Sequence, residues 1–82
     1  MHYRWGMPII QRFIACAIYI NARDHNPPHF HVRMSDGRDA FVEIESLEMH
    51  SGSVSRREIK EALAWAVTNR DLLRRKFKEY NP

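Results

Sequence analysis

Three of the five histidines of this 82-residue chain lie within the eight residues from Asp24 to His31. Two consecutive prolines, Pro27–Pro28, separate His25 from His29. A proline ring fixes φ at about −65° and removes a backbone donor, so this spacer is extended and semi-rigid. The segment therefore presents three imidazoles and one carboxylate on a backbone with little freedom.

His29 and His31 are two positions apart, on either side of Phe30. If these residues form a strand, both imidazoles point to the same face, with Cα atoms about 6 to 7 Å apart. A pair of imidazoles on one face of a strand suits a divalent transition metal such as Zn²⁺, Mn²⁺ or Ni²⁺. The upstream Asp24 can act as a further ligand or fix an imidazole tautomer. We therefore consider His25, His29, His31 and Asp24 as candidate metal ligands.

Two other interpretations of this run stay open. Without a metal, His29 and His31 can transfer protons, for example from a ribose 2′-hydroxyl, while Arg23 and Arg33 contact phosphate. Alternatively, the prolines only shape the entry into a strand, and the imidazoles bind carboxylates and backbone groups. The spacing is not a diagnostic zinc-finger pattern, and no cysteine pair accompanies it.

The elements that position these side chains follow from the pattern of apolar residues. We expect strands over residues 9–20, straight or bent, over residues 30–34 and over residues 40–45. The Asp-Gly step within residues 35–38 predicts a tight turn, because glycine readily takes positive φ. Residues 47–50 fit either a short fourth strand or the approach to a helix.

The sequence after residue 54 predicts helix. Ser55 and Glu58 have the S-x-x-E spacing of a capping box. Apolar residues then recur at helical spacing, at Ile59, Ala62, Leu63, Ala66, Leu73, Phe77 and Tyr80. Arg70 interrupts this stripe next to a second cap-like sequence, so we expect one kinked helix or two. The predicted fold is α+β, a small antiparallel sheet of three or four strands packed against a C-terminal helix or helix pair.

Positive charge gathers in the C-terminal third of the chain. Eight Lys and Arg residues and four acidic residues lie between positions 55 and 80, which gives +4 there, whereas the whole chain carries +3. Arg70, Arg74 and Lys78 are four residues apart and would form one ridge on a helix. Such a ridge can bind the phosphates of RNA or an acidic protein partner, but a simple solvated helix face is an equal alternative.

The composition excludes several classes of protein. A single cysteine, Cys16, cannot form an intramolecular disulfide, which argues against a disulfide-stapled secreted domain. No stretch approaches the roughly 20 apolar residues of a membrane span, and the first residues lack the layout of a signal peptide. We therefore expect one domain over residues 1–82, located in the cytoplasm and without a membrane partner.

The segment at residues 7–10, the run at residues 24–31 and the Ala-Trp-Ala at residues 64–66 together resemble the bacterial family catalogued as domain of unknown function 4160. The resemblance covers about residues 7–77. It implies a small α+β protein with a helical C-terminal half, no established activity, and a start at Met7 that would make residues 1–6 an extension. The chain departs from the family pattern at residues 53–55, where Leu-Pro is common, and at Phe77, where tryptophan is usual.

Genes of that family often neighbour genes of a second small family, domain of unknown function 2442, in an arrangement that resembles a toxin–antitoxin pair. The resemblance therefore implies a small protein partner encoded nearby. The expected function is a component of such a two-protein module, with a basic and histidine surface facing RNA or the partner. Two alternatives stay open: a metal-dependent phosphodiester hydrolase that uses His25, His29 and His31, and a purely structural protein-binding module.

Overall fold

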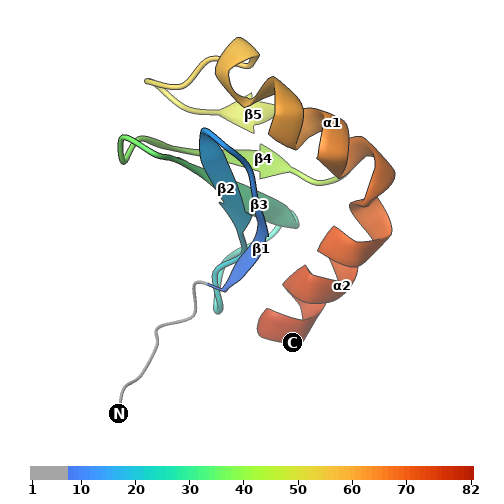
Figure 1. Ribbon diagram of the computed structural model, residues 1–82. Coiled ribbons are helices and arrows are strands. Elements are labelled where there is room, and N and C mark those ends of the chain that lie inside the picture. The colour runs from blue at the N-terminus through green and yellow to red at the C-terminus, as the bar shows by residue number, and fades with distance from the viewer. Residues whose placement is uncertain (1–7) are drawn as a thin grey trace.

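The computed structural model describes residues 8–82, so the expected extension at residues 1–6 and the expected start at Met7 lie outside it. Five strands form one antiparallel sheet in sequence order, and two helices follow (Figure 1). The elements are β1 (Ile9–Arg12), β2 (Cys16–Tyr19), β3 (His29–Met34), β4 (Asp39–Glu43), β5 (Met49–His50), a 3₁₀ turn η1 (Arg57–Ile59), α1 (Lys60–Thr68) and α2 (Arg70–Tyr80). The predicted α+β fold class is confirmed.

The stretch at residues 9–20, expected to be one strand, is a hairpin of β1 and β2. The backbone N–H of Phe13 donates to the carbonyl of Cys16 at 2.8 Å and closes the turn. The turn residues Ile14 and Ala15 are exposed. Because the turn contains no glycine, proline or asparagine, its residue types gave no local signal. The sheet consequently has five strands, one or two more than predicted.

The tight turn expected at residues 35–38 joins β3 to β4. Gly37 has a φ of +97°, a conformation that residues with side chains rarely adopt. The hairpin places His29 opposite Glu43 and His31 opposite Phe41. This register sets which side chains surround the two histidines.

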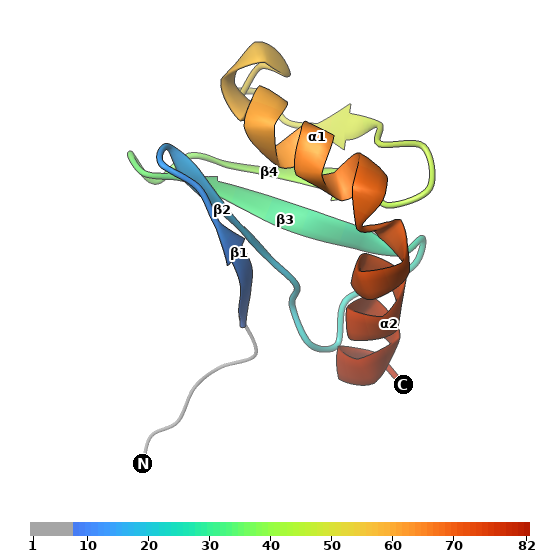
Figure 2. The same ribbon diagram turned by 45° about the vertical axis from the view of Figure 1, so that its right-hand side comes forward.

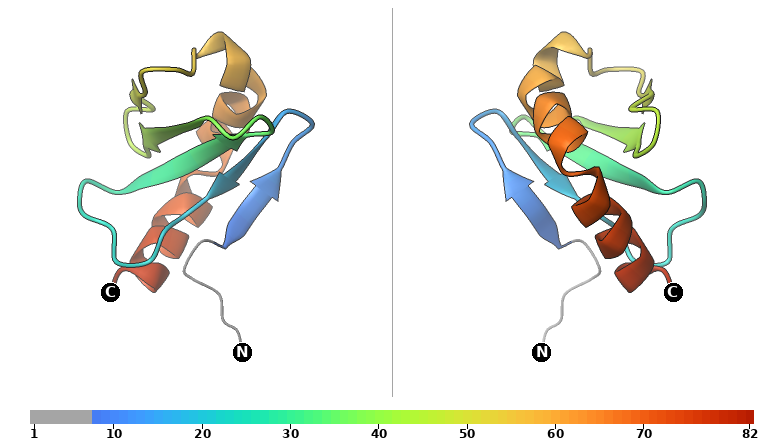
Figure 3. Two further views of the ribbon diagram at one scale, coloured as in Figure 1. Left: turned by 90° about the vertical axis from the view of Figure 1, so that its left-hand side faces the viewer. Right: turned by 90° about the vertical axis from the view of Figure 1, so that its right-hand side faces the viewer.

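Both helices pack against the same face of the sheet (Figures 1 and 2). On β3, Phe30, Val32 and Met34 point to the helices and are buried in the core. The alternate residues, including His31, point to the opposite face. His29, at the start of β3, begins this row and also packs against Phe77 of α2, with ring centroids 5.6 Å apart. Figure 3 shows that no helix covers this opposite face, which we call the open face.

The predicted apolar stripe forms the helical side of the core. Its fully buried members are Ile59, Ala62, Ala66, Leu73 and Phe77, and Leu63 and Tyr80 are partly buried against them. Burying one large aliphatic side chain contributes about 1.5–3 kcal/mol. This shared core fixes the helices on the sheet and so positions the C-terminal end of α2.

The helix breaks at Asn69, as the second cap-like sequence indicated. The Asn69 side chain donates from Nδ2 to the carbonyl of Trp65 at 2.8 Å, and its backbone N–H donates to Ala66 at 3.1 Å. Both bonds satisfy carbonyls at the end of α1, and α2 begins at the next residue. Within residues 8–82, neither helix is long and apolar enough to cross a bilayer.

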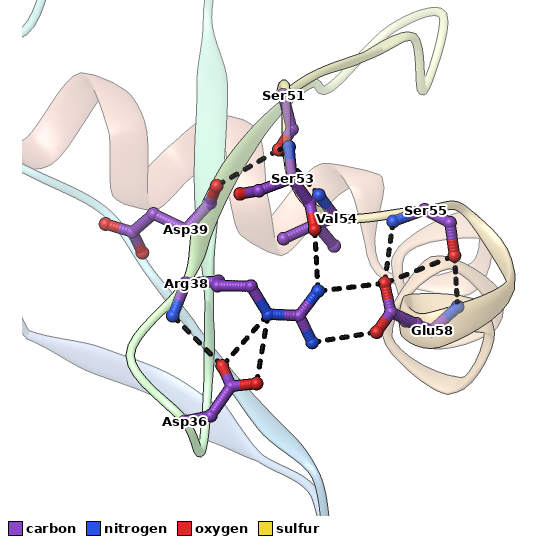
Figure 4. Close-up of polar contacts among 8 residues, drawn as sticks. All are labelled: Asp36, Arg38, Asp39, Ser51, Ser53, Val54, Ser55 and Glu58. Atoms are coloured by element: carbon purple, nitrogen blue, oxygen red, sulfur yellow. Dashed lines mark hydrogen bonds and ion pairs between the residues drawn. The ribbon is translucent and has the colours of Figure 1, made fainter.

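Arg38 ties the β3–β4 turn to the start of the helical region (Figure 4). The predicted capping box is formed, since the Ser55 N–H donates to Glu58 Oε1 at 2.9 Å and the Glu58 N–H donates to Ser55 Oγ at 3.3 Å. Arg38 donates from Nη2 to Glu58 Oε2 at 2.7 Å and from Nε to Asp36 Oδ2 at 3.0 Å. The hydrogen bonds from Arg38 and from the Ser55 backbone lower the pKa of Glu58 to about 2.

Candidate metal centre

The loop between β2 and β3 carries the histidine run and lies beside the C-terminal end of α2 (Figure 2). Asn81, just after α2, donates from Nδ2 to the carbonyl of Asn21 at 3.0 Å. The backbone N–H of Asp24 donates to Asn81 Oδ1. The end of the chain thereby fixes the loop, and with it the carboxylate of Asp24.

Three side chains converge at the start of β3. His29 Nε2 lies 2.9 Å from Asp24 Oδ2, and His31 Nε2 lies 3.0 Å from the same oxygen. One ligand atom from each side chain lies within 4.8 Å of the other two. The structure therefore brings together three of the four predicted metal ligands, and we call Asp24, His29 and His31 the His–Asp centre.

A backbone carbonyl determines the tautomer of His29. Its Nδ1 lies 2.8 Å from the carbonyl oxygen of Pro27. Because a carbonyl oxygen only accepts, Nδ1 carries the proton and donates it. In a neutral imidazole, Nε2 then has a lone pair directed at Asp24 Oδ2. These two atoms repel each other unless a proton or a metal cation lies between them.

The Asp24 carboxylate is the anionic partner in the centre. Burial raises the pKa of Asp24, but the hydrogen bonds from the His31 side chain and the His25 backbone, together with nearby His29, more than offset this and lower the pKa. Its Oδ1 accepts the His25 N–H at 3.0 Å, and its Oδ2 faces both imidazoles. An ionised Asp24 has no proton to share with the lone pair of His29.

The centre is closed on one side and open on the other. The His29 side chain is 2% exposed, and its ring centroid lies 5.0 Å from that of Phe41 and 5.6 Å from that of Phe77. The side chains of His31 and Asp24 are 17% and 18% exposed. A small ion or molecule can thus approach from the side of His31 and Asp24, while the aromatic wall keeps a low local dielectric.

His25, the fourth predicted ligand, does not join the centre. Its ring is tilted by 38° against that of His29, with centroids 5.4 Å apart, and the residue is exposed. It is absent from the group of convergent ligand atoms that the described residues form. His25 contributes its backbone N–H, which orients Asp24, and its side chain lies outside the three-residue set.

Sequence reasoning missed Asn21. Its Nδ2 lies 3.2 Å from His31 Nε2, and its Oδ1 is buried without a hydrogen-bond partner in the described part of the chain. Buried polar atoms without a partner are rare. A half-turn of the amide would bring Oδ1 to the position beside His31 Nε2. The only sequence signal was a polar residue at the end of an apolar stretch.

The predicted ridge on α2 is largely engaged in contacts with the sheet. Arg70 donates from Nε to the carbonyl of Ile44 at 3.0 Å. Arg74 donates from Nη2 to Glu45 Oε1 at 3.0 Å, and the hydrogen bond from Arg74 lowers the pKa of Glu45. Lys78 is exposed and forms no ion pair within residues 8–82. Of the three predicted cations, Lys78 is thus the one left free for a phosphate.

Arg23 precedes the His–Asp centre in the β2–β3 loop, and Arg33 lies towards the other end of β3. Arg23 is exposed in the loop, next to Asp24. Arg33 lies on the open face and forms an ion pair with Asp39 at 3.5 Å. Its guanidinium also lies over the ring of Tyr19, 5.7 Å from the centroid. Arg33 is therefore held in place, whereas Arg23 faces solvent.

A second group of potential ligands lies on β4 and β5. His50 Nε2 is 3.0 Å from Glu43 Oε2, and Glu48 completes the group. Here one protonated imidazole nitrogen can donate to a carboxylate, which satisfies both groups without a metal. This group provides an internal control for the His–Asp centre, where a neutral His29 cannot donate to the carboxylate because its one proton is on Nδ1.

Comparison with known proteins gives one match. A family model described as a domain of unknown function (DUF4160) matches residues 14–78, which include the whole His–Asp centre. No curated protein matches the chain, and no solved structure matches it. The family carries no activity with it, so the chemistry has to be argued from the geometry of the site.

Proposed function

The chain belongs to the family of the domain of unknown function DUF4160, and from the geometry of its His–Asp centre we propose that the protein binds one divalent transition-metal ion. The ligand atoms are His29 Nε2, His31 Nε2 and Asp24 Oδ2. One observation carries the proposal: the contact of His29 Nδ1 with the carbonyl of Pro27 leaves a neutral His29 with its Nε2 lone pair facing a carboxylate. A cation among the three atoms turns this repulsion into coordination.

The donor set fits such an ion. Two imidazole nitrogens and one carboxylate oxygen are the three protein ligands of many zinc sites that keep a fourth position open. The hydrogen bond from His29 Nδ1 to a backbone carbonyl is the outer interaction that usually orients a metal-binding imidazole. For such ligands, affinity rises from Mn²⁺ to Ni²⁺, and Zn²⁺ binds comparably to Ni²⁺.

Calorimetric titration of chelator-treated, tag-free protein with Zn²⁺, Ni²⁺ and Mn²⁺ tests the proposal. We expect one equivalent of Zn²⁺ to bind with a dissociation constant below about 1 μM, equivalent to about 8 kcal/mol. His31→Ala and Asp24→Asn should abolish this binding, because each removes one ligand that is partly exposed and not needed for the core. His50→Ala is the matched control and should bind like the parent protein.

Two results would contradict the proposal. Binding that survives both His31→Ala and Asp24→Asn would place the metal elsewhere. Binding that is lost in His50→Ala instead would assign it to the group on β4 and β5. Far-UV circular dichroism of every variant shows whether the fold is retained.

The opening on the side of His31 and Asp24 supports a second candidate, a metal-dependent phosphodiester hydrolase. A divalent cation supplies Lewis-acid chemistry when it is bound. Arg23 beside the centre can orient a phosphate. Cleavage of a fluorogenic RNA oligonucleotide should then require metal and be lost in His31→Ala. Cleavage that persists in the presence of a chelator favours proton transfer by His29 and His31 themselves. If the RNA is cleaved neither with metal nor with chelator, both enzymatic mechanisms are excluded.

The wider role in a toxin–antitoxin-like two-protein module, in the cytoplasm, is also proposed. It is supported by family membership and by the exposed cations of α2, Arg75 and Lys78. If RNA is the ligand, raising salt from about 50 to 200 mM should weaken binding severalfold or more. Unchanged affinity over this range would exclude an electrostatic RNA surface. Co-expression with the product of the adjacent gene tests for a protein partner, and a product that does not co-purify argues against the module.

A further inference from the structure

β1 is an edge of the sheet and pairs with β2 alone. Its other side presents backbone N–H and C=O groups that no strand within residues 8–82 pairs with. Proteins commonly protect such edges with charges, bulges or short strands, and β1 has a bulge between Ile9 and Gln11. Exposed apolar side chains nevertheless lie at its start and in the turn that follows it, since Ile9 is 43% and Ile14 is 96% exposed.

The sheet is hollowed between these two isoleucines. The pocket is lined by Ile9, Phe13, Ile14 and Tyr19, and its charged lining residues are Arg12 and Arg33. No acidic side chain is among its lining residues in the described part of the chain. An apolar pocket with only positive charges favours a ligand that is both apolar and acidic.

The acidic residue near this pocket is already engaged. Asp39 accepts a hydrogen bond from the Tyr19 hydroxyl at 3.0 Å and pairs with Arg33 at 3.5 Å. Arg12 is exposed and forms no ion pair within residues 8–82. Arg12 is therefore the cation that an incoming carboxylate can pair with without displacing another carboxylate.

We propose that β1 and this pocket form a docking surface for an extended, acidic segment of a partner protein. The segment pairs with the free edge of β1 and carries both apolar and acidic side chains at every second position, on the face turned to the pocket. In recognition by strand addition, main-chain hydrogen bonds provide affinity and alternate side chains provide specificity. Side chains two residues apart point to one face, so the apolar members of that set enter the pocket and an acidic member of the same set meets Arg12.

A second copy of this chain fits the surface less well. It would present the same Arg12 and Arg33 and no acidic residue from this pocket, so it lacks the complementary charge. The docking surface adjoins the His–Asp centre through Tyr19, whose ring stacks on that of His31 with centroids 5.1 Å apart, but none of the residues that line the pocket is a proposed metal ligand. The inference thus stands without the proposed metal.

Selection of a display library of random twelve-residue peptides against the folded protein tests the inference. We expect enriched peptides to carry apolar and acidic residues two positions apart, on one face of the strand. Ile14→Ser and Arg12→Glu should each weaken their binding about tenfold or more. The matched controls are Val67→Ser, a half-exposed apolar residue on α1, and Arg75→Glu on α2, and both should bind like the parent protein.

Three results would overturn the inference. Enriched peptides without acidic residues, or without apolar and acidic residues two positions apart, would refute the stated partner chemistry. Equal loss of binding in the test and control variants would show that the surface is not β1. Concentration-dependent dimers in light scattering that disappear in Ile14→Ser would assign the surface to a second copy. The substituted side chains are all exposed, and circular dichroism checks that the variants remain folded.

Discussion

The His–Asp centre and the ridge on α2 are both rich in ionisable groups, but they differ in how those groups are satisfied. In the ridge, Arg70 has a backbone carbonyl as its acceptor and Arg74 has a carboxylate. In the centre, a neutral His29 that donates from Nδ1 to Pro27 has only a lone pair to direct at the ionised Asp24. The comparison teaches that unsatisfied donors and acceptors, more than the number of charges, mark the candidate site.

Burial separates the two regions as well. Arg74 and its carboxylate partners are exposed, and exposed ion pairs contribute little to stability. His29 is enclosed by aromatic rings, so any interaction it makes is weakly screened. Substitutions should therefore have large effects in the centre and small effects in the ridge.

The largest expected effect is that of His29→Ala on folding. The change removes a buried ring and leaves the carbonyl of Pro27 without its donor, so it should lower the free energy of unfolding by about 2–4 kcal/mol. Urea denaturation in the presence of a chelator measures this loss without any contribution from metal. Arg74→Ala is the comparison from the ridge and should leave stability nearly unchanged. Equal losses in the two variants would remove the distinction between the regions.

Metal binding should stabilise the folded protein through the centre alone. A ligand that binds only the folded state at 100 times its dissociation constant adds about 2.7 kcal/mol. Thermal unfolding with and without Zn²⁺ should show a higher Tm in the parent protein and in Lys78→Ala. His31→Ala should show no shift. A shift of the same size in His31→Ala would mean that Zn²⁺ acts at another place.

Arg70→Ala should have an effect of intermediate size. It removes the donor to the carbonyl of Ile44, one hydrogen bond whose loss lowers the free energy of unfolding by about 1 kcal/mol. Lys78→Ala, on the same helix, should have no measurable effect. Denaturant unfolding of the two variants checks this difference. If both lose the same stability, the assignment of Arg70 to the fold and of Lys78 to the free surface is wrong.

The smallest expected effect is a pH dependence at the capping box. In the folded protein the pKa of Glu58 is about 2, below its ordinary value of 4.5, so its contribution is complete above pH 4.5. This contribution is lost as the pH falls from about 4.5 to about 2, because the unfolded chain takes up the proton first. Unfolding measured across this window should show a steeper loss in the parent protein than in Arg38→Ala. Identical slopes would show that Arg38 does not hold the carboxylate.

Local residue patterns were enough to predict much of the fold. The Asp-Gly turn and the capping box of Ser55 with Glu58 depend on residues close in sequence, and the structure forms both. The alternation of side chains along a strand likewise predicted that His29 and His31 lie side by side on one face of β3. The β1–β2 turn was missed because Ile14 and Ala15 are not turn residues, and nothing local distinguishes them from a strand.

The remainder of the site depends on contacts between distant parts of the chain. Asp24 reaches the imidazoles because its loop is fixed by Asn81, 57 residues later. Arg70 and Arg74 are engaged by Ile44 and Glu45, the two residues that follow β4, 26 and 29 positions earlier. The spacing of residues within the histidine run or within the helix does not predict such contacts between distant parts of the chain. Sequence reasoning therefore included His25 in the metal set and counted the ridge as free.

Anomalous diffraction from crystals grown with Zn²⁺ tests the central claim most directly. The account predicts one anomalous peak at about 2.0–2.2 Å from His29 Nε2, His31 Nε2 and Asp24 Oδ2. His29 Nδ1 should remain within hydrogen-bond distance of the carbonyl of Pro27. A peak at Glu43 and His50, or no peak near the three atoms at saturating Zn²⁺, would contradict the account and leave the His–Asp centre as a proton-sharing cluster.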